Sequence, residues 1–116
     1  MSYPFDSNTY KATILRHIDA DTTWAQVMLG MDVLVNITFR WSGIDCPERF
    51  TDAGKLATAR VNELLPVGSV CMIVTEKSPR EKFGRYLATF MDADGYSINQ
   101  RLIDEGHAVE YSGGAR

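Results

Sequence analysis

The sequence lacks long apolar runs and a secretory leader, and each absence excludes a class of protein. No window approaches the roughly 18 consecutive apolar residues of a transmembrane helix, so we expect no membrane insertion. The first six residues, Met-Ser-Tyr-Pro-Phe-Asp, contain neither a basic stretch nor an apolar segment of signal-peptide type. The sequence therefore predicts a cytoplasmic protein, and it does not distinguish a cellular protein from a virus-encoded one acting in a host cell.

Cysteine is scarce, which excludes a disulfide-rich scaffold. Cys46 and Cys71 are the only two cysteines, and without a secretory signal they are expected to be free thiols. His17 and His107 could join them as zinc ligands, but no two of these four residues have the close spacing typical of zinc sites. A zinc site is not predicted.

Basic residues are fewer than acidic ones, and the net charge is −3. Nucleic-acid-binding proteins usually present a basic surface, so this balance argues against tight nonspecific coating of a polyanion. Between residues 77 and 86, however, four Lys or Arg residues accompany a single Glu. This local excess predicts weak contact with a short stretch of nucleic acid.

Length and composition indicate one compact domain. The chain has 116 residues, of which 45% are hydrophobic and 23% charged, values that are ordinary for a globular protein. A single domain is expected over residues 1–116, with a flexible tail at 112–116 and a monomer as the default assembly.

Strands are expected over residues 10–18, 22–29, 33–41, 70–75 and 86–91. The clearest is 33–41, in which apolar residues alternate with polar ones and Arg40 shares the polar face with Asn36 and Thr38. Residues 30–32 and 92–95 have the composition of turns.

The face assignments of other segments are less clear. For residues 10–18 we expect one face to carry Ala12, Ile14 and Arg16, and the other to carry the residues between them. Four aromatic side chains are expected in the core or at a barrel rim rather than as stacking platforms, namely Trp24, Trp41, Tyr86 and Phe90.

Two helices are predicted. Residues 52–65 have helical spacing, with Leu56, Ala59 or Arg60, and Leu64 near one face, and Pro66 prevents continuation.

The second helix is short. Ser97 and Gln100 form a capping box at its start, and Gly106 supplies a left-handed stop at its end. Five strands with one helix after the third and one after the fifth favour a five-stranded Greek-key barrel of the OB type with helices, an α+β fold.

Three segments place charged residues at strand ends: Asp19-Ala20-Asp21-Thr22, the run Arg-Trp-Ser-Gly-Ile-Asp-Cys-Pro-Glu at 40–48, and Lys-Phe-Gly-Arg-Tyr-Leu-Ala at 82–88. In this order and at these separations they resemble the staphylococcal nuclease (thermonuclease) family, from about Tyr10 to Ala108. That family has OB-type barrels with helices packed outside. This chain looks like a compact member without the C-terminal helix of the secreted proteins.

The resemblance implies a calcium site. Asp21 and Asp45 would supply carboxylate ligands, and the main-chain carbonyl of Cys46 a third. The family usually has threonine at this last position, and a carbonyl ligand tolerates the change. Asp19 is expected to support these ligands. Ca²⁺ suits such a set because it prefers carboxylate, carbonyl and water oxygens.

The resemblance also implies catalytic roles. Glu48, stiffened by the preceding proline, corresponds to the candidate general base, with metal polarisation of water sharing the work. Arg40 and Arg85 would hold the phosphate, because planar guanidinium groups can bind two phosphoryl oxygens at once.

Substrate contacts are expected from Lys82, Phe83 and Tyr111, with phenylalanine where the family commonly has tyrosine. The function predicted is a calcium-dependent nuclease of low sequence specificity. It would act on single-stranded or frayed DNA or on RNA, between which the sequence does not discriminate. The alternative is a non-catalytic OB-type module that binds single strands. A partner-binding domain would need an exposed apolar patch, which the sequence does not locate.

Overall fold

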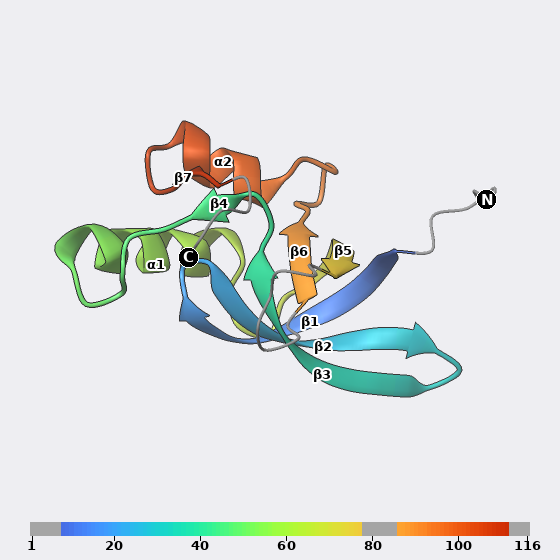
Figure 1. Ribbon diagram of the computed structural model, residues 1–116. Helices are drawn as coiled ribbons and strands as arrows, with labels where there is room; N and C mark the ends of the chain where they lie inside the picture. The colour runs from blue at the N-terminus through green and yellow to red at the C-terminus, as the bar shows by residue number, and fades with distance from the viewer. Residues whose placement is uncertain (1–7, 78–85, 112–116) are drawn as a thin grey trace.

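The protein is described here by a computed structural model in which residues 8–77 and 86–111 are placed (Figure 1). Five strands close a barrel in the order β1-β2-β3-β6-β5, with β3 and β6 parallel and the other pairs antiparallel. Their bounds are Thr9–Asp19 (β1), Thr22–Gly30 (β2), Val33–Trp41 (β3), Val70–Lys77 (β5) and Tyr86–Phe90 (β6). The expected OB-type barrel is confirmed.

A short ladder and two helices complete the fold. β4 (Ile44–Asp45) pairs with β7 (Val109–Glu110), while α1 (Asp52–Leu64) and α2 (Ile98–Asp104) follow β4 and β6. Figure 1 shows both helices on the side of the barrel away from the tip of the β2–β3 hairpin. Within the described residues, no helix is long and apolar enough to cross a bilayer.

The barrel interior follows the strand alternation. Phe39, Trp41 and Phe90 are almost fully buried, with the Trp41 and Phe90 rings stacked at 4.3 Å between centroids and Phe39 meeting Phe90 edge-on. Trp24 and Tyr86, in contrast, are 40% and 38% exposed. The expectation of a core or barrel-rim position is therefore confirmed as core for Trp41 and Phe90, whereas Trp24 and Tyr86 are partly exposed.

β1 contains an irregularity that changes its faces. Ile14 pairs with Ala25 and Arg16 pairs with Trp24, so Leu15 is an extra residue in the ladder. A β-bulge of this kind shifts the alternation by one position. Arg16 is consequently exposed on the outer face, and the expectation that it shares a face with Ala12 and Ile14 is wrong.

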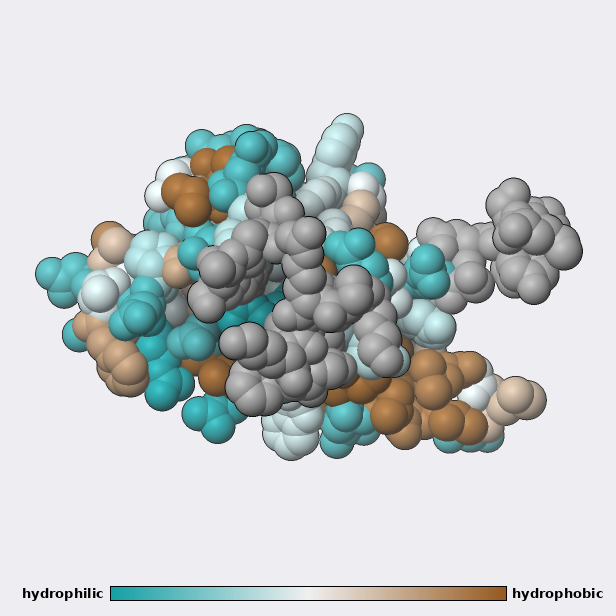
Figure 2. All heavy atoms as spheres, in the orientation of Figure 1, coloured by the Kyte–Doolittle hydropathy of each residue, from teal (hydrophilic) through white to brown (hydrophobic). Residues whose placement is uncertain are grey.

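The β2–β3 hairpin turns through Met31 and Asp32, whose φ angles of 52° and 62° are those of a primed two-residue turn. Apolar side chains are exposed around this turn, and Figure 2 shows them gathered over the projecting hairpin. They are Leu29, Met31, Val33 and Leu34. An exposed apolar patch is therefore present at a place that the sequence does not reveal.

α1 begins at the N-cap Thr51, whose hydroxyl accepts a hydrogen bond from the Gly54 amide. Its buried residues are Gly54, Ala57 and Val61, and Leu56 is 64% exposed. The expected buried face around Leu56 is wrong, because the helix turns its small residues toward the rest of the protein.

α2 is capped as expected at its first turn, where the Ser97 hydroxyl accepts from the Gln100 amide. The other half of the capping box is wrong, since the Gln100 side-chain amide donates to Asp104 instead. Gly106 has a φ of 83° and ends the helix in the left-handed conformation.

Candidate active site

The candidate site starts at the tight turn between β1 and β2. Ala20 and Asp21 form this turn, and both are almost completely buried. The Asp21 carbonyl accepts a hydrogen bond from the Trp41 amide at 2.9 Å, which ties the turn to the end of β3. A carboxylate buried in this way requires partners for its charge.

Two segments distant in sequence supply those partners. Arg40 Nη2 lies 3.5 Å from Asp21 Oδ2, and the Cys46 amide donates to the same oxygen at 3.1 Å. The fold therefore brings the Asp45–Cys46 peptide and the Arg40 guanidinium to one carboxylate. The Asp45 side chain is exposed on β4, whose position is set by the pairing of Asp45 with Val109.

The donors around Asp21 fit a hard cation by type. Among the described residues, no three His, Cys, Asp or Glu side chains converge into a metal-binding group. A calcium site here would combine the two carboxylates of Asp21 and Asp45 with the Cys46 carbonyl and water, and calcium commonly accepts such mixed oxygen sets. A carboxylate has about four lone-pair positions, so Asp21 can accept its present partners and still coordinate.

Arg40 carries an unsatisfied donor. Its side chain is 17% exposed, and its buried Nε has no hydrogen-bond partner within the part of the chain that the structure describes. A buried N–H without a partner is uncommon and costs free energy. An anionic ligand at this guanidinium would supply the missing acceptor.

Glu48 lies in the loop between β4 and α1 with an exposed side chain. Its carbonyl accepts from both the amide and the hydroxyl of Thr51, at 3.0 and 2.7 Å. A Cβ added to Gly54 would lie 1.8 Å from this same carbonyl oxygen, so α1 packs directly against the Glu48 backbone. Thr51 and Gly54 thus help to position Glu48. In the sequence, the only sign of this role is a glycine within a helical pattern.

Asp19 is partnered elsewhere. Its carboxylate lies 3.8 Å from Arg49 Nε, and both side chains are partly exposed. Its support for the Asp21 ligands stays a prediction.

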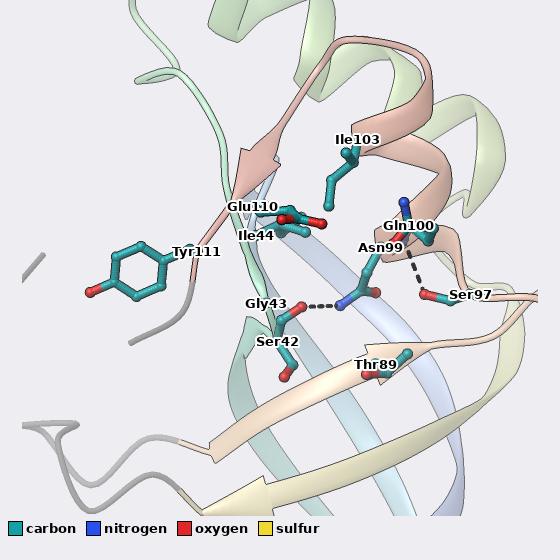
Figure 3. A pocket seen from close by; sticks show the side chains of 10 residues that line it. All are labelled: Ser42, Gly43, Ile44, Thr89, Ser97, Asn99, Gln100, Ile103, Glu110 and Tyr111. Atoms are coloured by element: carbon teal, nitrogen blue, oxygen red, sulfur yellow. Dashed lines mark hydrogen bonds between the residues drawn. The ribbon is translucent and has the colours of Figure 1, made fainter. Parts of the chain in front are cut away.

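Four expected substrate or phosphate contacts remain to be placed. Lys82, Phe83 and Arg85 fall outside the described residues. Tyr111 follows β7, and its amide donates to the Gly43 carbonyl at 2.9 Å. Figure 3 shows its ring pointing away from Asn99 and Gln100.

Asn99 is the polar centre of the same region. Its side chain is buried, donates to the Ser42 and Ala88 carbonyls and accepts from the Phe90 amide. It borders a pocket of about 250 Å³ between α2 and the β4–β7 ladder (Figure 3). The hydrogen bonds of Asn99 connect β6 with the turn after β3. In the sequence, the only sign of this role is the position of Asn99 beside the N-cap of α2.

The two cysteines form no disulfide, as expected. Burial raises the pKa of the Cys71 thiol to about 11, so this thiol stays protonated at neutral pH.

Comparison with known proteins agrees with the fold. A family model described as staphylococcal nuclease homologue matches residues 38–115, which include Arg40, Asp45 and Glu48. Two proteins named uncharacterized endonuclease, from Escherichia coli O157:H7 and Escherichia coli, are each 26% identical to the chain over 110 residues. Those alignments cover 95% of this chain and 67% of each relative. Because the family model covers more than half of its length, the chain belongs to the staphylococcal nuclease homologue family.

Proposed function

We propose that the protein is a calcium-dependent nuclease that hydrolyses phosphodiester bonds of DNA or RNA with low sequence specificity. Family membership and the likeness to relatives named endonucleases support nuclease activity. The observation that carries the proposal is the meeting of Arg40 and the Cys46 amide at the buried Asp21 carboxylate. Three segments of the chain meet there and combine acidic ligands with a guanidinium group that can bind phosphate.

In this proposal Asp21, Asp45 and the Cys46 carbonyl hold Ca²⁺, with Asp19 nearby. When bound, the ion supplies positive charge for the phosphoryl oxygens and lowers the pKa of water. The protein's own contribution is to hold these oxygens on the turn before β2 and on β4. The β4–β7 pairing keeps the second of these in place.

Arg40 and Arg85 bind non-bridging phosphate oxygens. A phosphate oxygen near Arg40 would accept a hydrogen bond from its buried Nε. This bond would strengthen as negative charge develops on the phosphate in the transition state. Glu48 accepts the proton of the attacking water, and its loop is held by Thr51 and Gly54.

Lys82, Phe83 and Tyr111 are proposed to contact the substrate beyond the scissile phosphate. The protein is proposed to act as a monomer.

The second candidate is a nucleic-acid-binding module without catalysis. The exposure of Trp24 on the outer barrel favours nucleic-acid contact, and this feature is compatible with either function. The two candidates differ in whether the function requires Glu48 and calcium.

The test is release of acid-soluble nucleotides from denatured DNA. We expect release with Ca²⁺, loss of release with EGTA, and a drop of about two to three orders of magnitude in Glu48→Gln, as for the loss of one catalytic group. Glu63→Gln is the matched control, because this exposed glutamate lies on α1. Equal release in all samples would contradict the metal and glutamate mechanism, and release in none would favour the binding module.

A further inference from the structure

The outer face of the barrel continues from the candidate site along β1, β2 and β3. Arg40 pairs with Thr22 in the ladder, and the next outward row consists of Arg16, Trp24 and Thr38. The following row consists of Thr13, Gln26 and Asn36. We name these two rows the Trp24 face.

Side-chain direction follows from the burial of the alternate residues. Thr23, Ala25 and Val27 of β2 are buried in the barrel, so Trp24 and Gln26 between them point outward. Arg16 joins this face only because of the bulge at Leu15. The bulge therefore places a guanidinium directly opposite an exposed indole.

The charge of the Trp24 face differs from that of the whole chain. The protein carries a net charge of −3, yet neither row contains a carboxylate. Arg16 is exposed there, and Lys11 lies in the row beyond, paired with Met28. The remaining polar groups are hydroxyls and amides, which can bond to bases or phosphates without charge repulsion.

The exposure of Trp24 is the second sign of a ligand. A tryptophan is usually largely buried, whereas Trp24 is 40% exposed on a regular strand. Exposed aromatic rings next to cationic side chains are the means by which single-stranded nucleic acids are bound without sequence selection, because every base has a face that can stack.

We propose that the Trp24 face binds the single-stranded segment of the substrate next to the phosphate held at Arg40, with one base stacked on Trp24 and Arg16 contacting the backbone. This proposal rests on the proposed nuclease function for the position of the scissile phosphate. A base that is paired and stacked within a duplex cannot place its face on the Trp24 indole, whereas an unstacked base can, so the occupant is single-stranded.

Binding can be tested apart from cleavage with the full chain carrying Glu48→Gln. A short oligothymidylate is titrated in EGTA while tryptophan fluorescence is recorded. Trp41 is buried against Phe90, so a change in exposed-tryptophan emission reports Trp24. We expect quenching on binding, and in Trp24→Ala an affinity lower by about tenfold by a fluorescent-oligonucleotide anisotropy assay. Trp24→Phe should restore most of the affinity, because it keeps a stacking ring.

Matched variants separate this role from a general loss of structure. Tyr96 is 72% exposed in the turn before α2, and Tyr96→Ala should bind like the parent. Arg16→Ala should reduce the salt dependence of binding, with the slope of log affinity against log salt falling by about 0.7. Unchanged emission on saturation, or equal affinities of Trp24→Ala and the parent, would overturn the proposal.

Cleavage distinguishes the face from the catalytic centre. With Ca²⁺ and wild-type Glu48, Trp24→Ala should raise KM for a single-stranded oligonucleotide about five- to tenfold with kcat unchanged. Its kcat/KM for a small substrate, thymidine 5′-(4-nitrophenyl phosphate), should equal that of the wild type. Wild-type protein that binds oligothymidylate but cleaves neither substrate would refute the nuclease function and leave the binding face supported. Equal KM values for the oligonucleotide would refute the face alone.

Discussion

At the scale of single residues, His17, Thr23 and Trp41 form a chain of buried hydrogen-bond donors and acceptors in the barrel. His17 Nε2 lies 2.6 Å from the Leu65 carbonyl and Nδ1 lies 2.8 Å from the Thr23 hydroxyl. Because a carbonyl can only accept, Nε2 carries the hydrogen and Nδ1 accepts from Thr23. The Trp41 indole N–H donates to the same hydroxyl at 2.8 Å. His17 thus joins the end of α1 to the barrel as a neutral ring.

This arrangement gives the free energy of unfolding a pH dependence. Burial lowers the pKa of His17 below its ordinary 6.5, with the bond to Leu65 opposing the shift. The unfolded chain therefore binds the proton more readily, so stability is lost as the pH falls below about 6.5 and this group has no effect well above it. We expect His17→Gln to be less stable at pH 7.5 but to lose less stability than the wild type on acidification to pH 5. Urea unfolding at several pH values measures this, and parallel curves for the two proteins would contradict it.

The direction of a side chain can be predicted from the sequence better than its contacts can. The outward direction of Arg40 follows from the alternation of β3, and the structure confirms it. The bond from the Cys46 amide to Asp21 does not, because it joins residues far apart in the chain. The role of Asn99 is equally hidden, since its three partners come from the turn after β3 and from β6.

At the scale of elements, α1 shows how packing overrides pattern. The spacing of Leu56 and Leu64 predicts a buried face, yet Leu56 is exposed. The helix instead buries Gly54, Ala57 and Val61, and at Gly54 the Glu48 carbonyl lies too close for a larger side chain. Glycine within a helix costs about 1 kcal/mol relative to alanine. Its presence at position 54 is explained by the close approach. Hydrophobic periodicity counts apolar residues and contains no information on this approach.

The same contact predicts an effect on catalysis. Gly54→Ala must displace either α1 or the Glu48 carbonyl, because the new Cβ would lie 1.8 Å from that oxygen. We expect a loss of about 1–3 kcal/mol of stability from overpacking, together with a lower kcat. Ala59→Gly, at an exposed position of the same helix, should cost about 1 kcal/mol and leave kcat unchanged. Urea unfolding and turnover on single-stranded DNA measure both effects, and an unaltered kcat in Gly54→Ala would show that Glu48 is not positioned by α1.

The strands differ in how well alternation describes them. The bounds of β3 agree with the expected 33–41, and Val33, Val35, Ile37, Phe39 and Trp41 keep period two along it. In β1 the extra residue Leu15 reverses the faces of Arg16 and His17. A bulge is a tertiary accommodation between two strands, and a single strand's sequence does not record it.

At the scale of the whole molecule, closure of the barrel brings the site together. The parallel pairing of β3 with β6 places Arg40 opposite Leu87, and the ladder of β4 with β7 places Asp45 opposite Val109. Neither pairing follows from local periodicity, and the likeness to a known family supplied the expected topology. Local patterns define the elements, while their meeting at Asp21 depends on contacts between distant parts of the chain.

A ligand that binds across these parts should therefore stabilise the whole fold. Ca²⁺ together with a nucleoside 5′-phosphate would join the β1–β2 turn, β4 and the Arg40 guanidinium, which separate on unfolding. At a concentration about 100 times Kd, such a ligand adds about 2.7 kcal/mol to the free energy of unfolding, or roughly 10 °C in Tm for a domain of this size. Differential scanning fluorimetry with each ligand alone and with both measures the shift. In Asp21→Asn the shift should disappear whatever the starting Tm, since the variant lacks the charged ligand at the centre of the site. A wild-type Tm that does not change at millimolar Ca²⁺ and nucleotide would mean that the acids and Arg40 do not form a common site.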